Sequence, residues 1–313
     1  MNIIKTLKNL FRLKPVLAWT VTSFILVLSA GIHDGLIPNY WLAMISIFVP
    51  LLLQGVVSHA INDIVDENVD RSTDMEGTKR IKVLMSGIAS RKDLWFLSLV
   101  SIFICMIIVL YLYTIRGFII PLILSGGIFM IYSYNFKPMK LNYRPFGDYT
   151  VVLPVILLIS CGFSYVIFGT LSESILVVSI INAIMNMAWY QFSRLQDVWP
   201  DYKHGKMTTF ASILKKYDDD FDRFYKDSMG YLSWSFLILM AYILFLTAIF
   251  MVNCIIPLIL LWIFAGNMVT FIKSGHFRDF YNISITSAYL RSFGMYITYI
   301  NCVLLSLSLI VFK

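Results

Sequence analysis

Nine stretches of the chain are predominantly apolar and about 20 residues long, the length that a helix needs to cross the hydrocarbon core of a bilayer. This feature constrains the fold most strongly, because a backbone in lipid must satisfy its own hydrogen bonds within helices or closed barrels. The stretches lie near residues 16–33, 41–60, 94–114, 117–135, 149–169, 173–192, 231–251, 254–272 and 289–311. The sequence therefore predicts an all-α integral membrane protein with nine transmembrane helices in one bundle.

Composition agrees with this prediction. The chain is 59% hydrophobic and 14% charged, whereas soluble domains carry roughly 25% charged residues. The polar segments between the apolar stretches indicate no second soluble domain, so we expect a single domain over residues 1–313. All four cysteines lie inside apolar stretches and away from metal-ligand spacing, so we interpret them as packing residues; they are Cys105, Cys161, Cys254 and Cys302.

The basic residues are distributed unevenly among the loops. With nine spans, 23 of the 25 lysines and arginines fall on one face, and only Arg116 and Lys313 fall on the other. The positive-inside rule assigns the basic face to the cytoplasm. We therefore expect a protein of the cell inner or plasma membrane with a cytoplasmic N-terminus, whose basic segment 1–14 is a retained anchor. Topology and anionic lipid explain the net charge of +7, so no nucleic-acid partner is expected.

Two acidic segments follow the second and the sixth apolar stretches, both on the basic face. In the first, Asn62, Asp66 and Asp70 stand four residues apart, and in the second Asp197 and Asp201 do so. This spacing puts the side-chain oxygens on one face of a helix that continues from the span. Carboxylates this close repel unless a cation lies between them, and Mg²⁺ takes oxygen ligands that it commonly shares with substrate phosphates. The predicted metal ligands are Asn62, Asp63, Asp66, Asp70, Asp197 and Asp201.

Basic residues on the same face suit the phosphate part of such a site, because Arg binds phosphate in two-pronged fashion and Lys acts as a point charge. The candidates for diphosphate binding are Arg80, Lys82, Lys140, Arg144 and Lys206. A metal ion together with a phosphate group therefore explains both sets of charges. The contiguous acidic run at 218–222 lacks helical spacing and is interpreted as a solvated loop.

These motifs resemble those of the UbiA superfamily of intramembrane prenyltransferases. The family motif Asn-Asp-x-x-Asp-x-x-x-Asp stands intact at 62–70, and Asp-x-x-x-Asp at 197–201 is followed by Gly205, Lys206 and Thr208. A third family feature is present as Tyr132-Ser133, then Lys140, then Gly147-Asp148. The resemblance covers essentially the whole chain.

The resemblance implies Mg²⁺-dependent transfer of an isoprenoid chain from an allylic prenyl diphosphate to an aromatic acceptor, with release of diphosphate. The implied acceptor is a quinone precursor such as dihydroxynaphthoate or hydroxybenzoate, and the loops of the cytoplasmic face are expected to form a cap. The resemblance also implies catalytic roles for three residues. Lys140 contacts the diphosphate, and Tyr132 or Asp148 orients the acceptor or positions Lys140.

Two other functions remain open. Some members of the superfamily fold the isoprenoid chain on itself and act as terpene cyclases without an acceptor. An ion-coupled transporter also carries intramembrane acids, but transporters tend to hold such sites near the midplane on interrupted helices. In this chain the acidic residues lie at the ends of the spans, beside basic residues that suit phosphate binding, so the transporter is the less favoured alternative. Pro200, in the second motif, is expected to kink its helix because it lacks a backbone N–H.

Overall fold

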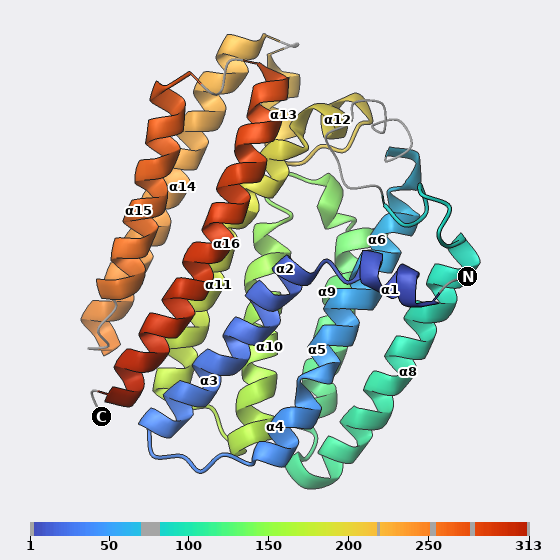
Figure 1. Ribbon diagram of the computed structural model, residues 1–313, viewed down its shortest axis with the longest axis vertical. Coiled ribbons are helices and arrows are strands. Elements are labelled where there is room, and N and C mark those ends of the chain that lie inside the picture. Colours follow the sequence, from blue (N-terminus) through green and yellow to red (C-terminus); the bar gives the residue numbers. More distant parts are fainter. Residues whose placement is uncertain (1–2, 70–81, 218–219, 251–254, 276–278, 312–313) are drawn as a thin grey trace.

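The computed structural model describes residues 3–69, 82–217, 220–250, 255–275 and 279–311, and describes the side chains of all of these except 246–250. Over these residues the chain is a bundle of helices, with no β-strand among them (Figure 1). Asp70 and Arg80 of the predicted site lie outside the described residues.

The helices run in chain order through two halves of similar length. Those of the first half are α1 (Ile3–Leu10), α2 (Leu13–Val16), α3 (Thr22–His33), α4 (Tyr40–Ser46), α5 (Phe48–Leu52), α6 (His59–Val65), α8 (Arg91–Arg116) and α9 (Ile119–Asn135). Those of the second half are α10 (Tyr149–Phe168), α11 (Glu173–Gln196), α12 (Val198–Lys203), α13 (Thr209–Lys216), α14 (Phe221–Phe250), α15 (Ile255–Lys273) and α16 (Phe280–Val311). Two π-helical turns, η1 (Leu17–Val21) and η2 (Leu53–Ser58), join α2 to α3 and α5 to α6, and the 3₁₀ turn η4 (Leu141–Tyr143) precedes α10.

Eight described helical runs are long and apolar enough to cross a membrane. They are Leu13–His33, Tyr40–Val65, Arg91–Arg116, Tyr149–Phe168, Glu173–Gln196, Phe221–Phe245, Ile255–Lys273 and Phe280–Val311. A further apolar helix, α9, has 17 residues. The membrane character of the chain follows from these helices, and the count of nine spans stays a prediction.

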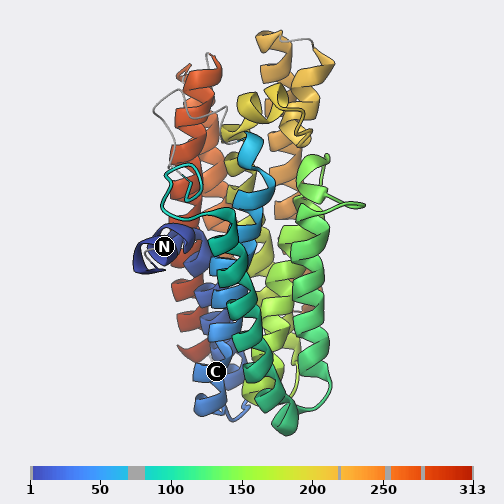
Figure 2. The same ribbon diagram turned by 90° about the vertical axis from the view of Figure 1, so that its right-hand side faces the viewer.

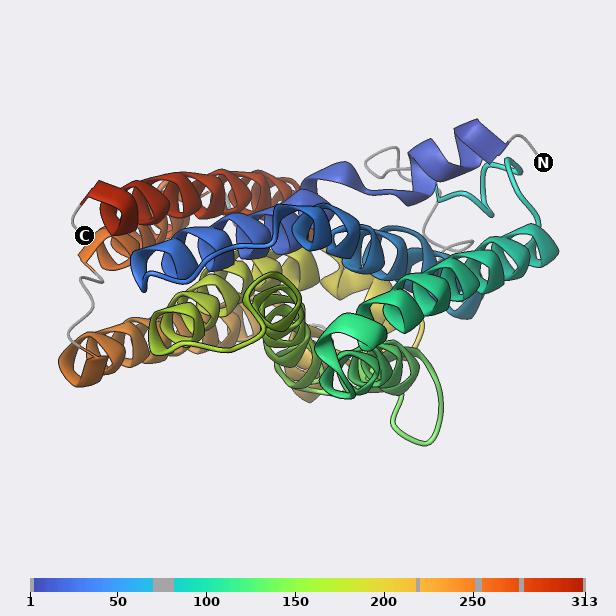
Figure 3. The same ribbon diagram turned by 90° about the horizontal axis from the view of Figure 1, so that it is seen from below.

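Helix α11 forms the centre of the bundle, since 83% of its apolar window is buried, the highest share among the eight runs. It packs against α16, α10 and α3, and α16 and α3 run side by side (Figures 1 and 3). At one edge α15 lies beside α16 and α14 lies beside α15, and at the other edge α8 lies next to α9 (Figure 1). Helices α12 and α13 lie at the same end of the bundle as the end of α6 (Figures 1 and 2), which we call the aspartate end.

Both acidic motifs lie where a helix is interrupted. Helix α6 ends at Val65, and Asp66 leaves the helical conformation with φ −93° and ψ 7°. Helix α11 ends at Gln196, and Asp197 has φ −99° and ψ 10°. The continuous helix expected through Asp66 is therefore broken at that residue. Pro200 lies in the first turn of α12, where its missing N–H is not needed, so the break expected at Pro200 occurs three residues earlier, at Asp197.

Candidate active site

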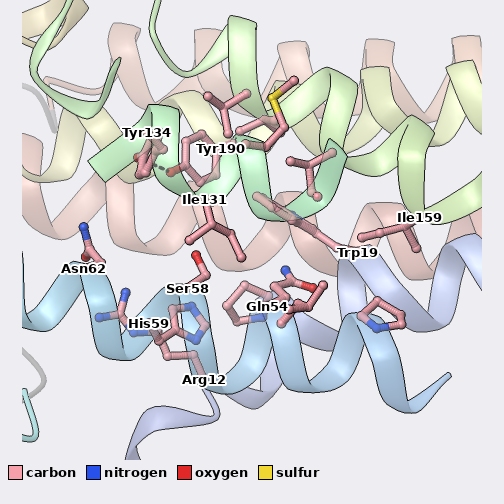
Figure 4. A pocket seen from close by; sticks show the side chains of 18 of the residues that line it. Arg12, Trp19, Gln54, Ser58, His59, Asn62, Ile131, Tyr134, Ile159 and Tyr190 are labelled. Atoms are coloured by element: carbon pink, nitrogen blue, oxygen red, sulfur yellow. Dashed lines mark hydrogen bonds between the residues drawn. The ribbon is translucent and has the colours of Figure 1, made fainter. Parts of the chain in front are cut away.

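A cavity of about 850 Å³ extends from the aspartate end into the bundle. Its polar and charged lining residues at this end include Arg12, Lys14, Asn62, Asp66, Lys82, Arg194, Asp197, Asp201, Lys206 and Arg291. Figure 4 shows how Asn62, His59 and Ser58 lie along one wall, formed by α6 and η2. Tyr134 and Tyr190 lie across the cavity from them (Figure 4).

The carboxylate of Asp66 is the most densely bonded group of the first motif. It is 1% exposed and accepts hydrogen bonds from the Lys206 ammonium at 2.7 Å, the Tyr143 hydroxyl at 3.0 Å and the Asn62 amide at 3.1 Å. Burial works to raise the pKa of Asp66, but the positive charges of Lys206 and Lys82 and the hydrogen bonds from Lys206 and Tyr143 together outweigh it, so this pKa lies below its usual value. Asp66 is therefore a carboxylate with cations held close to it.

A glycine turn brings Lys206 to this position. The N–H of Lys206 donates to the carbonyl of Asp201 at 2.8 Å and that of Gly205 donates to Tyr202 at 3.1 Å, the two hydrogen bonds of a Schellman motif. Gly205 has φ +68°, a conformation in which a side chain is strained. The turn reverses the chain directly after α12, so that the Lys206 ammonium lies 2.7 Å from Asp66 and 4.0 Å from Asp201. Lys206 thus bridges the two acidic motifs.

Asp201 is the buried carboxylate of the second motif. It is 4% exposed, and the hydroxyl of Thr208 donates to it at 3.4 Å. Burial and the neighbouring charge of Asp197 raise the pKa of Asp201 to about 6, although Lys206 acts in the opposite direction. Burial alone would lower the pKa of Lys206, but Asp66 and Asp201 together raise it above its usual value, so Lys206 stays charged.

Asp63 of the first motif is not among the residues that line the cavity, unlike Asp66. Its carboxylate is 2% exposed, binds the Arg12 guanidinium at 3.1 Å and lies 4.0 Å from the Lys82 ammonium. Since Arg12 and Lys82 both line the cavity, Asp63 holds two cations at its polar end. Asp66, rather than Asp63, presents its carboxylate to the cavity.

Asp148 forms the centre of a second network, at the start of α10. Its Oδ1 accepts from Arg194 Nε at 2.9 Å and Nη2 at 2.7 Å, and from the Tyr134 hydroxyl at 3.2 Å. The Tyr190 hydroxyl lies 3.1 Å from that of Tyr134 and 3.2 Å from Arg194 Nη2. Arg194 and both tyrosines line the cavity, whereas Asp148 does not. Asp148 therefore fixes the positions of three groups that do.

The loop before Asp148 is tight for a steric reason. A Cβ atom at Gly147 would lie 1.8 Å from the carbonyl oxygen of Leu141, so only glycine fits there. The 3₁₀ turn η4 thus packs directly beneath the start of α10. This packing explains why a Gly-Asp pair follows the loop.

Three other predicted site residues are not among those that line the cavity: Tyr132, Lys140 and Arg144. The ammonium of Lys140 lies 3.5 Å from the centre of the Tyr143 ring, and Asp66 is among the charges that act on it. Burial lowers the pKa of Lys140. Arg144 is exposed and donates to the carbonyl of Pro138 at 2.8 Å. Tyr132 is 47% exposed and donates to the carbonyl of Lys137 at 3.0 Å, so Tyr134 rather than Tyr132 reaches the cavity.

The arginines that line the cavity were not singled out from the sequence; they are Arg12, Arg194 and Arg291. The uneven distribution of basic residues assigned all three to membrane topology. Arg291 carried a usable signal, because it lies within the apolar window 289–311, where an ionisable residue is usually functional. Arg194 lies three residues before Asp197 at the end of the same helix, a spacing that brings side chains together.

Below its polar end the cavity continues as an apolar groove. On α10 its lining residues form one helical stripe: Val151, Val152, Val155, Leu158, Ile159, Gly162, Phe163 and Val166. Helices α8 and α9 complete the wall with Val109, Leu112, Ile120, Ile123, Leu124, Gly127, Met130 and Ile131. From Val151 to Val166 the stripe covers fifteen residue steps, or about 22 Å at about 1.5 Å per residue. The site thus joins a charged head to a long apolar groove.

The fold is similar to that of several solved structures. One is a UbiA homologue from Archaeoglobus fulgidus bound to DMAPP and Mg²⁺, with 16% identity, a TM-score of 0.62 and coverage of 94% of this chain and 99% of that chain. The same homologue bound to GPP and Mg²⁺ matches with 14% identity, a TM-score of 0.59 and coverage of 91% and 99%. A digeranylgeranylglyceryl phosphate synthase matches with 14% identity, a TM-score of 0.61 and coverage of 96% and 99%. At these identities the likeness shows a shared fold.

Sequence comparison gives the more specific result. No curated protein matches the chain, but the model of the UbiA prenyltransferase family matches residues 16–289. That range contains both acidic motifs, the loop before Asp148 and most of the cavity lining. The chain therefore belongs to the UbiA prenyltransferase family.

Proposed function

We propose that the protein transfers an isoprenoid chain from an allylic prenyl diphosphate to an aromatic acceptor of the quinone-precursor type, such as dihydroxynaphthoate or hydroxybenzoate. The C–O bond of the diphosphate breaks, its electron pair leaves with the diphosphate, and a new bond joins the isoprenoid to the acceptor, which loses a proton. One observation carries this proposal. A single cavity joins carboxylates and cations at one end to a long apolar groove. These two parts match the charged head and the apolar chain of a prenyl diphosphate.

The donor atoms at the aspartate end fit Mg²⁺, which prefers carboxylate and amide oxygens together with substrate phosphates. The ligands that line the cavity would be Asn62, Asp66, Asp197 and Asp201. Asp63 and Asp70 complete the proposed set from the sequence motif. The metal would neutralise negative charge on the diphosphate oxygens.

Cations of the chain would hold the diphosphate and stabilise it as it leaves. Lys206 is kept charged between the two motifs, and Lys82 lines the same end of the cavity. Arg12 adds a guanidinium there, held by Asp63. On the basis of the resemblance to the family, we propose that Arg80, Lys140 and Arg144 also bind the diphosphate.

Aromatic side chains lie where the groove begins. Tyr134, Tyr190 and Trp19 line the cavity, and the ring centres of Trp19 and Tyr190 are 5.9 Å apart. The faces of such rings attract cations, so these residues would stabilise an allylic cation and exclude water. We propose that Asp148 positions the residues of this wall. Tyr132, whose ring stacks on that of Phe136 and whose hydroxyl bonds to Lys137, would support the loop that carries Lys140.

The length of the groove indicates the donor. An isoprenoid unit adds four bonds to a chain, and since three backbone bonds of an extended peptide cover about 3.3–3.6 Å, one unit covers about 4.5 Å. The stripe of about 22 Å on α10 then accommodates about five units. We therefore propose a donor of four or five isoprenoid units, of which geranylgeranyl diphosphate is the shorter.

The distribution of basic residues supports a cytoplasmic aspartate end, with the N-terminus on the same side. The loops at this end, including α12 and α13, would form the cap over the site. We propose that the diphosphate donor therefore reaches the site from the cytoplasm and the adjacent leaflet.

The test measures diphosphate release from geranylgeranyl diphosphate by protein in lipid nanodiscs, with Mg²⁺ or EDTA and with a panel of aromatic acceptors. Asp66→Asn should abolish Mg²⁺-dependent release, because it removes a charge that faces the cavity. Asp222→Asn, which changes an exposed acid in the first turn of α14, is the matched control and should behave as the wild type.

Retained release in Asp66→Asn would contradict the proposal. Release without any acceptor, together with a cyclic hydrocarbon product, would assign a terpene cyclase. No release from any donor would favour the transporter alternative.

A further inference from the structure

Helix α1 lies across the bundle rather than along it. It runs nearly perpendicular to the spans (Figures 1, 2 and 3). Leu10 of α1 is 1% exposed and belongs, with Leu7, to the same cluster of packed apolar side chains as Leu94 and Leu97 near the start of α8. One face of α1 is therefore packed against the bundle, and the helix has a fixed place beside the first turns of α8.

The rest of the surface of α1 is divided between apolar and basic side chains. Ile3 and Ile4 are 51% and 81% exposed, and on a helix they adjoin the packed face. Lys5 and Lys8 are exposed on the opposite face. An apolar face beside a lysine face, on a helix that lies across the spans, is typical of helices that lie in the interface of a bilayer.

The level of α1 along the spans also fits the interface. Helix α8 has 26 residues and is about 39 Å long, whereas the hydrocarbon core is about 30 Å thick, so the ends of α8 reach the headgroups. Its first two turns carry the exposed Lys92 and Trp95, and the Trp95 ring stacks on that of Phe136. Basic and aromatic side chains of this kind mark the boundary of a membrane. Helix α1 therefore lies at the depth of the lipid headgroups.

Arg12, two residues after the end of α1, links this helix to the active site. Its guanidinium binds Asp63 at 3.1 Å, and the residue lines the cavity. The neighbouring Phe11 packs on the backbone of η2, since a Cβ atom at Gly55 would lie 2.5 Å from the Phe11 ring. A shift of α1 would therefore move Arg12 at the site.

We propose that α1 binds the surface of an anionic bilayer and that this contact holds Arg12 in place at the active site. The lysines of α1 bind the phosphate groups of anionic phospholipids, and Ile3 and Ile4 enter the adjacent acyl region. Each lysine near such a surface strengthens the binding by roughly fivefold. The lipid contact is independent of the proposed function, whereas its effect on turnover rests on that function.

A fluorescent label on Ile4→Cys, in a background without native cysteines, reports the lipid contact without any turnover. The protein is placed in phosphatidylcholine nanodiscs with or without phosphatidylglycerol, and a small share of the lipid carries a nitroxide near its headgroup. We expect the nitroxide to quench the label, and to do so more strongly in the anionic nanodiscs. A label on Lys203→Cys, at an exposed position of α12, is the control and should be quenched weakly in both.

Variants of the lysines test the charge. When Lys5→Gln and Lys8→Gln are combined, the fraction of phosphatidylglycerol that gives half of the effect should rise several-fold. The pair Lys5→Arg and Lys8→Arg keeps both charges and should behave as the wild type. Lys273→Gln removes an exposed cation at the end of α15 and serves as the matched control.

Turnover tests the link to the site. An anionic surface alone should hinder an anionic donor, because like charges repel. At saturating Mg²⁺ we nevertheless expect phosphatidylglycerol to raise kcat/KM for geranylgeranyl diphosphate by about two- to fivefold in the wild type, and not in the double glutamine variant. In Arg12→Met the label on Ile4→Cys should still be quenched, but turnover should no longer respond to the lipid.

The two readouts separate this inference from the proposed function. Quenching at Ile4→Cys that is weak, or equal with and without phosphatidylglycerol, would overturn the lipid contact. Quenching that responds to the lipid in a protein whose turnover does not respond would overturn the link through Arg12. If no donor is consumed in any nanodisc, the proposed function fails, and the quenching still decides whether α1 binds anionic lipid.

Discussion

Lys206 connects the two acidic segments, because its ammonium binds Asp66, which lies 140 residues earlier in the chain. Its ammonium lies between buried Asp66 and Asp201, so a neutral residue there would leave two carboxylates close together in a low dielectric. Breaking a buried ion pair of this kind costs about 3–5 kcal/mol. Gly205 matters for the same reason, because its left-handed turn aims Lys206 at them.

We therefore expect Lys206→Met to lower the Tm in EDTA by several degrees. Added Mg²⁺ should raise the Tm of this variant more than that of the wild type, because a divalent cation can replace the missing positive charge. The measurement is thermal unfolding with and without Mg²⁺. Lys203→Met, an exposed lysine of the same segment, is the control. An equal response of variant and wild type to Mg²⁺ would argue against a metal at these carboxylates.

Asp201 gives the site a dependence on pH. Because its pKa is raised to about 6, the group is mostly protonated below pH 6, and a metal must then displace the proton. We expect the apparent Kd for Mg²⁺ to be nearly constant above pH 7 and to rise up to about tenfold for each unit below pH 6. Metal titrations followed by thermal shift at several pH values test this. In Asp201→Asn that dependence should disappear, and its persistence would assign it to another group.

At the scale of whole elements, the groove between α8, α9 and α10 should act as a ruler for the donor. Gly127 lines it seven residues below Tyr134, about 10 Å along α9 at about 1.5 Å per residue. A Cβ atom at this glycine would meet only Leu53, at an ordinary 3.8 Å. A larger side chain therefore projects into the groove without disturbing the backbone, and leaves room for about two isoprenoid units.

Gly127→Leu should consequently keep activity with geranyl diphosphate and lose most of its activity with geranylgeranyl diphosphate. The readout is the ratio of kcat/KM for the two donors. Gly266→Leu is the matched control, since a Cβ there meets nothing within 4 Å and the residue is exposed on α15. An unchanged ratio in Gly127→Leu would mean that the donor lies elsewhere.

The sequence predicts the helices of this fold well, because each apolar stretch carries its own signal. The positions at which these helices are interrupted were harder to predict. No proline or glycine marks the break at Asp66 in the sequence. The break at Asp197 comes three residues before the proline that predicted it. Position on a helix face was also ambiguous. Tyr132 and Tyr134 are two residues apart and so point in different directions, and only packing shows that Tyr134 faces the cavity. The positive-inside rule explained Arg12, Arg194 and Arg291 equally well without a site, so spacing alone did not reveal them.

Over the whole molecule, the charge asymmetry predicts one orientation in the membrane. In a background without native cysteines, Lys203→Cys at the aspartate end and Thr170→Cys at the opposite end place single thiols at exposed positions. An impermeant maleimide should label Thr170→Cys in intact cells and Lys203→Cys only after the membrane is opened. The reverse pattern would place the aspartate end outside and would exclude a cytoplasmic supply of donor.

The groove that runs from Tyr134 down to Leu112 and Val166 also has a practical consequence. Alkyl detergents are single apolar chains of similar width to an isoprenoid, and each of them carries a polar head. They should therefore enter the same groove with the polar head at the aspartate end and compete with the donor. The competition should strengthen as the alkyl chain approaches the length of the groove. A purification that looks gentle by yield can thus deliver an inhibited protein, and the apparent KM for the donor should change with the surfactant chosen.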